Sequence, residues 1–355
     1  MKTLMITTMR NEGAFLLEWI AHHRAAGVSD FLVYTNDCDD GTDAMLDRLQ
    51  AIGGLTHRRN PGPWKEGPQW AALKDADSQG VVKAADWLLV SDVDEFVNIH
   101  TGDHTVGALV AALPEASAIA LTWRFFGNAG VVGYEDRPVT EVFRRAAPAV
   151  LHWPWRAAMI KTLFHNDGTY RKLGVHRPRS PNPGLIAGAR WFDGSGRDLG
   201  EAFRTQRLFS DFGQDNYQLA QINHYALGAM ESYVVKADRG RANREAGAFD
   251  MAYWVERNFS AVEDTSIDAL AGARGAVLAE FHADPILGPL HRAAVAWRRA
   301  RFTALMSAEP WRALFGRLMM TPATRVLSRE EAALVIAHAM RARAGVAGET
   351  MAPDC

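Results

Sequence analysis

The segment Trp87-Leu88-Leu89-Val90-Ser91-Asp92-Val93-Asp94-Glu95-Phe96 joins four consecutive apolar residues to a cluster of three acidic ones. A short, uninterrupted apolar run is typical of a strand that is buried on both faces of a sheet. Two carboxylates at positions i and i+2 of the following turn can face one small volume, which is unfavourable unless a cation neutralises them. Oxygen ligands without a nearby cysteine favour Mg²⁺ or Mn²⁺. The segment therefore predicts a buried strand that ends at a metal site, with a solvated acidic turn as the alternative.

The residues before this segment alternate between strand and helix patterns. The strand patterns cover residues 4–8, 31–34 and 87–91, and the helix patterns cover residues 15–23, 42–49 and 69–85. Such alternation predicts βαβ units, in which helices cover both faces of a parallel sheet. We therefore expect an α/β fold with a Rossmann-like, mostly parallel sheet flanked by helices.

Polar clusters follow three of the predicted strands. They are Arg10-Asn11-Glu12, residues 36–40, and the acidic cluster at residues 92–95. In open α/β sheets, ligands bind beyond the carboxyl ends of the strands. We therefore expect these three clusters to converge on one crevice.

The chain changes character after about residue 284. Residues 117–215 carry short strand patterns, such as 119–123 and 158–161, whereas residues 290–306, 310–320 and 329–344 have helical periodicity with arginines on the opposite face. This predicts a helical C-terminal extension over residues 285–355. Its apolar positions fit packing against the rest of the protein or another subunit, and the arginines leave peripheral contact with an anionic membrane as the alternative.

Composition restricts the class of protein. The 355 residues include 39 Lys and Arg against 41 Asp and Glu, for a net charge of −2, and 48% are hydrophobic. This balance fits an ordinary globular protein and lacks the broad basic field of a nucleic-acid binder. Cys38 and Cys355 cannot form a disulfide framework, and no run of about 18 uncharged apolar residues occurs. We expect a cytoplasmic protein, with membrane association left open.

Several of these motifs together resemble a known family. They are Thr8-Met9-Arg10-Asn11-Glu12, Leu16-x-Glu18-Trp19-x-x-His22-His23, Asn36-x-x-x-Asp40-Gly41-Thr42, the acidic segment at 87–96, Trp123-Arg124-Phe125-Phe126-Gly127-Asn128 and Asn223-His224-Tyr225. In combination they are similar to bacterial glycosyltransferases of the family 2-like group related to family 92, which have the GT-A fold. The resemblance is good over residues 3–100 and does not cover the helical extension.

The resemblance implies an enzyme that transfers a hexose from a nucleoside diphosphate sugar to a glycan or lipid-linked acceptor, as in polysaccharide biosynthesis, with inversion at the anomeric carbon. It implies Mn²⁺ or Mg²⁺ as cofactor. It also implies that residues 1–284 form the GT-A domain, with the nucleotide-sugar-binding part at 1–100 and the acceptor part at 101–284. The expected donor is a UDP-sugar ahead of a GDP-sugar, although Thr35 and Asn36 stand where family 2 usually has an aspartate.

The resemblance also assigns roles to individual residues. Asp94 and His224 are expected to bind the metal together with Asp92, which also suits the ribose or a metal-bound water. A buried structural histidine is the alternative for His224, and a solvated basic helix face is the alternative for Lys236 and Arg239. The expected donor-binding residues are Thr8, Arg10, Asn11, Glu12, Asn36, Asp40, Gln69, Asp92, Lys236 and Arg239.

Inverting transfer also needs a general base near the acceptor hydroxyl, usually a carboxylate whose pKa is tuned by burial. Asp193 follows Trp191 and Phe192 and is our first candidate, ahead of Asp211, Asp215 and His176. Tryptophans such as Trp123, Trp153, Trp155 and Trp191 could stack on a sugar ring.

Two other functions are compatible with an acidic α/β site. A nucleotidyltransferase would carry a glycine-rich loop and a lysine after the first strand, which Arg10-Asn11-Glu12-Gly13 does not match. An inactive glycan-binding or scaffold protein would be expected to have lost its metal ligands, whereas Asp92, Asp94 and His224 are all present.

Overall fold

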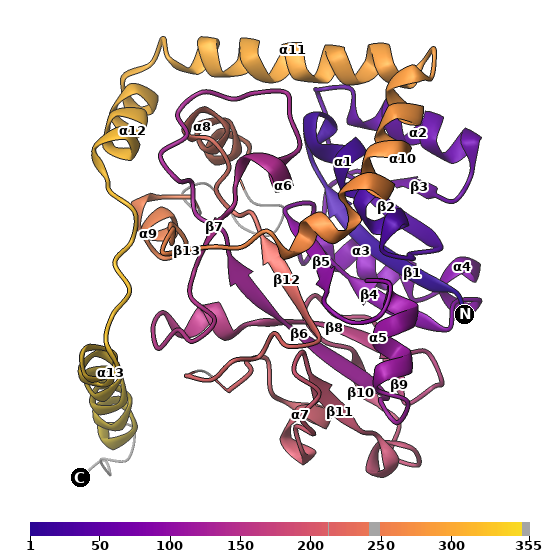
Figure 1. Cartoon of the computed structure of the whole chain (residues 1–355), viewed down its shortest axis with the longest axis vertical. Helices are drawn as coiled ribbons and strands as arrows, with labels where there is room; N and C mark the ends of the chain where they lie inside the picture. Colours follow the sequence, from indigo (N-terminus) through magenta and orange to yellow (C-terminus); the bar gives the residue numbers. More distant parts are fainter. Residues whose placement is uncertain (212, 241–248, 350–355) are drawn as a thin grey trace.

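The computed structural model describes residues 1–211, 213–240 and 249–349. Cys355 lies outside this part of the chain. The described residues form a mixed α/β fold built on a nine-stranded sheet, with strand order β3-β2-β1-β4-β8-β6-β12-β5 and β11 added beside β6 (Figure 1). Two smaller two-stranded sheets flank it.

The strands of the large sheet are β1 (Thr3–Met9), β2 (Asp30–Thr35), β3 (Thr56–Arg59), β4 (Trp87–Val90), β5 (Glu95–Ile99), β6 (Ala118–Phe125), β8 (Ile160–His165), β11 (Trp191–Asp193) and β12 (Ala220–His224). The small sheets pair β7 (Arg145–Ala146) with β13 (Val262–Glu263), and β9 (Tyr170–Lys172) with β10 (Arg179–Pro181).

The α-helices are α1 (Gly13–Ala25), α2 (Thr42–Ile52), α3 (Pro68–Ala76), α4 (Gly80–Lys83), α5 (Val106–Ala112), α6 (Val139–Val142), α7 (Glu201–Thr205), α8 (Met230–Arg239), α9 (Met251–Val255), α10 (Ala271–Ala283), α11 (Leu287–Leu305), α12 (Glu309–Met320) and α13 (Arg329–Glu349).

The N-terminal part of the sheet confirms the predicted alternation of strands and helices. β3, β2, β1 and β4 are parallel neighbours, and the central residues of β1, β2 and β4 are buried. Two details differ from the prediction. The helix expected over 69–85 is divided into α3 and α4 by a turn at residues 77–79, and β3 was not predicted because Thr56–Arg59 is a mostly polar, charged stretch.

The C-terminal part of the sheet is mixed, because β11 and β12 run parallel to β6 whereas other neighbours are antiparallel, so the sheet is mostly but not purely parallel. β8 runs antiparallel to both β4 and β6, and β12 runs antiparallel to β5. Antiparallel neighbours need no helical crossover. The helix patterns that indicated parallel strands are therefore restricted to the first hundred residues.

The sheet changes partners along β6. The first half of β6 pairs with β8 and β11, whereas Trp123 to Phe125 pair with β12. β12 then pairs with β5 in a register that sets His224 opposite Glu95. This register brings the end of β12 beside the acidic turn that precedes β5.

The helices after residue 270 cover α1, α2 and α8 (Figure 1). Arg48 on α2 forms a salt bridge with Asp284, and His291 contacts Asp136. α11 also lies very close to the start of α1, because a Cβ atom at Gly13 would come within 2.8 Å of the Cβ of Ala294. The boundary at residue 284 stays a prediction, but the helices on either side of it pack on the same surface.

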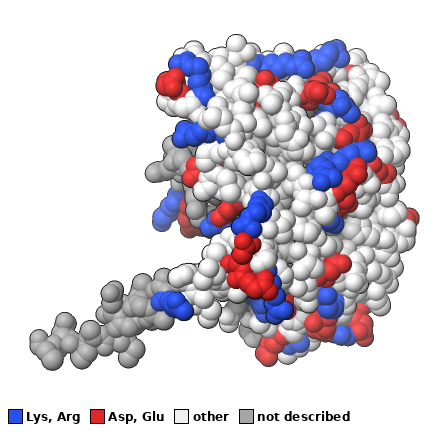
Figure 2. Space-filling view, turned by 60° about the vertical axis from the view of Figure 1, so that its left-hand side comes forward, with Lys and Arg blue, Asp and Glu red and all other residues white. Residues whose placement is uncertain are grey.

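The apolar side of α11 faces the protein, with Leu287, Ala294, Val295 and Leu305 buried. Within the described residues, no helix is both long and apolar enough to cross a bilayer. α13 extends away from the rest of the molecule, and acidic and basic side chains are interspersed on the face shown in Figure 2.

Candidate active site

A cleft of about 900 Å³ lies beyond the ends of β1, β4 and β12. α3, α8 and α9 contribute further walls. Nine of the residues predicted from the sequence line this cleft: Thr8, Arg10, Glu12, Gln69, Asp92, Asp94, His224, Lys236 and Arg239. The cleft therefore brings together polar residues as far apart in the chain as Thr8 and Arg239.

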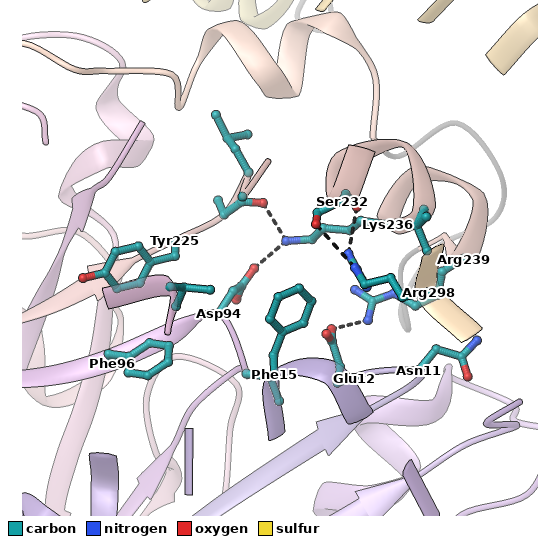
Figure 3. A pocket seen from close by; sticks show the side chains of 16 residues that line it. Asn11, Glu12, Phe15, Asp94, Phe96, Tyr225, Ser232, Lys236, Arg239 and Arg298 are labelled. Carbon is teal, nitrogen blue, oxygen red and sulfur yellow. Dashed lines mark hydrogen bonds and ion pairs between the residues drawn. The ribbon is translucent and has the colours of Figure 1, made fainter. Parts of the chain in front are cut away.

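Asp94 lies between a histidine and a lysine. Its Oδ1 is 3.7 Å from Nε2 of His224. Its Oδ2 is 2.5 Å from Nζ of Lys236 (Figure 3). Burial alone would raise the pKa of Asp94, but the positive charge of Lys236 holds this pKa well below its ordinary value, with a further contribution from the neighbouring His224. Asp94 is therefore a carboxylate at neutral pH.

His224 packs against two aromatic rings at the end of β12. The centroid of its ring is 4.4 Å from that of Trp123 and 5.7 Å from that of Phe125. Burial lowers the pKa of His224, against the opposing effect of Asp94. A neutral imidazole with a nitrogen facing a carboxylate has the chemistry of a metal ligand.

Asp92 points to a different partner. Its Oδ2 lies 3.0 Å from Nζ of Lys161, and Nε2 of Gln69 donates to its Oδ1 at 3.4 Å. Among the described residues, no group of three or more His, Cys, Asp or Glu side chains converges as a metal site would require. The structure therefore brings together two of the three predicted ligands, Asp94 and His224, whereas Asp92 faces Lys161. Such a pair fits a divalent cation that completes its coordination with substrate oxygens and water.

Glu95 holds the acidic turn in place through hydrogen bonds, although the sequence indicated no role for it. Its carboxylate accepts hydrogen bonds from Ser91 Oγ (3.0 Å), the Asp92 amide (2.8 Å) and Trp123 Nε1 (2.8 Å), and lies 3.3 Å from Lys161 Nζ. Both Glu95 and Lys161 are fully buried. Burial raises the pKa of Glu95, with Lys161 acting against this rise. Glu95 thus contacts Lys161, which pairs with Asp92, and it also accepts a hydrogen bond from Trp123, whose ring packs against His224.

Trp19 of α1 supports the same turn from the other side. Its Nε1 donates to the backbone oxygens of Asp92 and Glu95, at 3.1 and 3.0 Å. Because these oxygens flank Asp94, the backbone of the acidic turn is fixed without using the side chain of Asp94.

A smaller cavity of about 50 Å³ adjoins Asp94 (Figure 3). It is lined by Asn11 and Glu12 at the start of α1 and by Lys236 and Arg239 of α8. Arg239 forms an ion pair with Glu12, and its Nη1 donates to the backbone oxygen of Arg10 at 2.6 Å. The two cations predicted to bind phosphate are therefore each held by a carboxylate of the N-terminal part.

Asn36 and Asp40 do not line the cleft. Asp40 accepts hydrogen bonds from the amides of Gly13 (2.8 Å) and Thr42 (2.9 Å), so it stabilises the starts of α1 and α2. Asn36 is buried, and no partner for its Oδ1 is found among the described residues. The expected convergence is observed for Arg10-Asn11-Glu12 and the acidic cluster at residues 92–95. The cluster at residues 36–40 does not reach the cleft, but its Asp40 accepts a hydrogen bond from the amide of Gly13, next to the first cluster.

Asp193 lies apart from the cleft, next to the opposite end of β6, where it pairs with Ala120. Its carboxylate accepts hydrogen bonds from the amides of Ser195 and Arg197, both at 2.9 Å, and forms an ion pair with the Arg197 guanidinium at 2.6 Å. This is the bonding of a structural turn. The geometry therefore argues against Asp193 as the general base.

The other candidates for the base occupy different positions. Asp211 pairs with Arg207, and Asp215 accepts from the amide of Tyr217, whereas His176 lines the cleft. His176 donates through Nδ1 to the backbone oxygen of Ile160 at 3.1 Å, in the tautomer that this bond requires. Burial lowers the pKa of His176 to about 4, so it is neutral at pH 7.

Aromatic residues also line the cleft: Trp70, Trp123, Trp155, Phe249 and Tyr253. Of the tryptophans proposed for stacking, Trp123 and Trp155 therefore face the cleft, whereas Trp191 is buried against Tyr170.

Sequence comparison places this arrangement among known proteins. A sequence profile of glycosyltransferase family 92 matches residues 5–189. A family 92 protein of Oryza sativa subsp. japonica is 26% identical over 236 residues, which are 64% of this chain and 33% of the rice protein. A family 92 protein of Ricinus communis is 31% identical over 100 residues, which are 27% of this chain and 17% of that protein. The chain thus spans a third or less of these relatives, and both are plant rather than bacterial proteins.

Solved structures give weaker similarities. The structure of residues 1–349 of S. aureus TarS is 12% identical, with a TM-score of 0.32, and covers 84% of this chain and 92% of that one. The same fragment in complex with UDP matches with 15% identity and a TM-score of 0.26, covering 38% of each chain. At these scores the similarity identifies neither a shared ligand nor a shared activity.

Proposed function

This chain belongs to glycosyltransferase family 92, whose profile covers more than half of it, and from this premise we propose that it transfers a sugar from a nucleoside diphosphate donor. In the full proposal, the enzyme moves a hexose to a glycan or lipid-linked acceptor, with inversion and with the help of Mn²⁺ or Mg²⁺. We also propose that the fold is of the GT-A type. The observation that carries the proposal is the pairing of Asp94 with His224 in a large cleft that also holds Lys236 and Arg239.

We propose that Asp94 and His224 hold the divalent cation. When bound there, the cation would neutralise the charge that develops on the departing diphosphate. Lys236 and Arg239 lie one turn apart on α8, and their positive charges suit phosphate oxygens. Lys236 is paired with Asp94, and Arg239 is paired with Glu12. The diphosphate would therefore have to compete with these carboxylates for the two side chains.

Thr8, Arg10 and Gln69 line the same cleft and are proposed to bind the nucleoside of the donor, with UDP ahead of GDP. Asp92 is proposed to contact the ribose or a water on the cation, with Lys161 fixing its carboxylate. Asn36 and Asp40 are assigned no direct contact, because neither lines the cleft.

The aromatic walls of the cleft support a sugar acceptor. Flat rings of Trp and Tyr stack against the C–H faces of sugars, and Trp155 and Tyr253 stand with Arg156 and Glu256 at the same opening. His176 presents a neutral imidazole to this opening, which suits a hydrogen bond from an acceptor hydroxyl. A pKa of about 4 makes it a weak base, so we propose that it orients the hydroxyl rather than deprotonates it.

The test is a thermal-shift and calorimetric titration of the full chain with UDP and GDP, each with and without Mn²⁺. We expect UDP with Mn²⁺ to raise Tm, and we expect Asp94→Asn to abolish the contribution of the metal. Asp193→Asn is the matched control, because it removes a carboxylate outside the cleft. Failure of both nucleotides to bind in the presence of Mn²⁺ or Mg²⁺ would contradict the proposal. Once a donor is found, the anomer formed, read by NMR, tests inversion.

A further inference from the structure

Helix α11, the first helix after residue 284, places a buried arginine at the wall of the small cavity next to Asp94. Arg298 is 6% exposed and lines this cavity together with Asp94, Lys236 and Arg239 (Figure 3). In the described part of the chain, no ion pair includes Arg298. Burial lowers its pKa to about 10, so the guanidinium remains charged at neutral pH. A buried cation without a carboxylate is unfavourable unless other contacts compensate.

The contacts of Arg298 are made with α8 and α1. Its Nη2 donates to the backbone oxygen of Ser232 at 3.0 Å, and its Nε donates to Ser232 Oγ at 3.4 Å. The guanidinium also lies over the ring of Phe15, 4.4 Å from its centroid. Arg298 thus connects the first turns of α8 to the first turn of α1.

Ser232 precedes Lys236 by four residues on α8, so the two lie one above the other on the helix. The last turn of α8 is held by a second arginine of α11, because Arg301 donates to both carboxylate oxygens of Asp238 at 2.8 and 2.9 Å. Two arginines of one helix therefore hold both ends of the helix that carries Lys236 and Arg239.

We propose that Arg298 is a positioning residue of the donor site, which holds the Ser232 turn of α8 so that Lys236 and Arg239 face Asp94 and Glu12. The helical segment after residue 284 is then part of the binding machinery and not an appendage. This proposal rests on the proposed function for its ligand, and on the contacts among α1, α8 and α11 for its geometry. Arg298 acts through α8, in contrast to Lys236 and Arg239, which face the cleft themselves.

The first test needs no ligand. Hydrogen–deuterium exchange over residues 230–239 is compared in the full chain for wild type, Arg298→Met, Arg298→Lys and Arg299→Met. Arg299 is the matched control, because it neighbours Arg298 on α11 but is exposed. We expect exchange at α8 to be at least about tenfold faster in Arg298→Met. We expect no change in Arg299→Met and an intermediate rate in Arg298→Lys, whose ammonium can still donate to Ser232. Unchanged exchange in Arg298→Met would overturn the proposal.

The second test measures UDP binding in the presence of Mn²⁺ by calorimetry. Arg298→Met should weaken binding about tenfold, Arg299→Met less than about twofold, and Arg298→Lys should recover most of the loss. Equal weakening by Arg298→Met and Arg299→Met would overturn the proposal. If Arg298→Met does not fold, the same comparison is made between Arg298→Lys and Arg299→Lys. Absence of binding of both UDP and GDP by the wild type would contradict the proposed function alone, since the exchange experiment still decides the role of Arg298.

Discussion

Lys236 Nζ lies 2.5 Å from Asp94 Oδ2, although 142 residues separate the two along the chain. An ammonium thus occupies one oxygen of the carboxylate, while His224 faces the other. The pair joins the acidic turn after β4 to α8, and any ligand of Asp94 must share it with Lys236.

We predict that Asp94→Asn and Lys236→Met each lower kcat/KM by roughly 10²–10³-fold. The first removes the carboxylate proposed to hold the divalent cation, and the second removes a positive charge that faces the developing negative charge of the leaving group. The double variant should lose less than the product of the single losses, since the two residues act as a unit. Steady-state kinetics with the donor identified by calorimetry measure both effects. Lys83→Met, at an exposed position on α4, is the control and should retain full activity. Activity of Asp94→Asn equal to that of the control would exclude the carboxylate from the reaction.

The buried pair of Glu95 and Lys161 should contribute strongly to stability. We predict that Lys161→Met lowers the free energy of unfolding by about 3–5 kcal/mol, because it leaves the buried Glu95 carboxyl without its cation. Glu95→Gln should cost less, because Lys161 keeps Asp92 as a partner. Urea denaturation of the single and double variants gives the coupling between them. Lys74→Met breaks an exposed lysine–glutamate pair with Glu66 and should cost no more than about 1 kcal/mol. Equal losses for the buried and the exposed lysine would show that burial does not matter here.

Replacing Asp193 should affect stability rather than catalysis. Asp193→Asn weakens the ion pair with Arg197 and is expected to cost about 1–3 kcal/mol of unfolding free energy. We predict that kcat changes less than about threefold, since Asp193 lies outside the cleft. Chemical denaturation and steady-state kinetics on the same samples separate the two effects. A large loss of kcat at unchanged stability would restore Asp193 as the general base.

Stability should fall in mildly acidic solution because of His22. This side chain is fully buried on α1, its Nε2 donates to the backbone oxygen of Val97 at 2.7 Å, and burial lowers its pKa to about 4. The unfolded chain has the ordinary value of about 6.5, so between these values the unfolded state binds the extra proton. His22 therefore stabilises the fold fully above pH 6.5, and this contribution is lost as the pH falls toward 4.

We predict a loss of about 2 kcal/mol from His22 between pH 6.5 and pH 5. Urea denaturation at several pH values measures this slope. His22→Gln, which can still donate to Val97, should reduce the slope by up to one proton. Identical slopes for His22→Gln and wild type would mean that another group causes the acid sensitivity.

The parts of the fold that were predicted correctly depend on local patterns. β1, β2 and β4 are apolar runs bounded by polar loops. α1 was predicted from apolar residues at helical spacing, although the structure buries all of residues 16–23. The pairing of β12 with β5 and β6 could not be predicted in this way. It depends on contacts between residues more than 90 positions apart, for which the local sequence carries no signal.

The candidate site shows the same division. Asp94 and His224 were found because they stand in recognisable motifs, but two cations that support the site, Lys161 and Arg298, were missed. Lys161 is a single lysine in an otherwise mostly apolar strand, and Arg298 stands at a position of α11 whose neighbours on the helix face are buried. A single charged residue among apolar neighbours was the only indication that Lys161 and Arg298 are buried. The residues that pair with them could not be inferred from the sequence.

The strand order has a consequence for synthesis of this protein. Within the described residues, β5 pairs only with β12, and the hydrogen bond between Asn98 and Asn223 spans 125 residues. At ribosomal speeds of about 5–20 residues per second, roughly 6 to 25 s pass between the emergence of these two strands. During that time the nascent chain carries an apolar strand with an open edge, the kind of surface that invites aggregation and that chaperones cover.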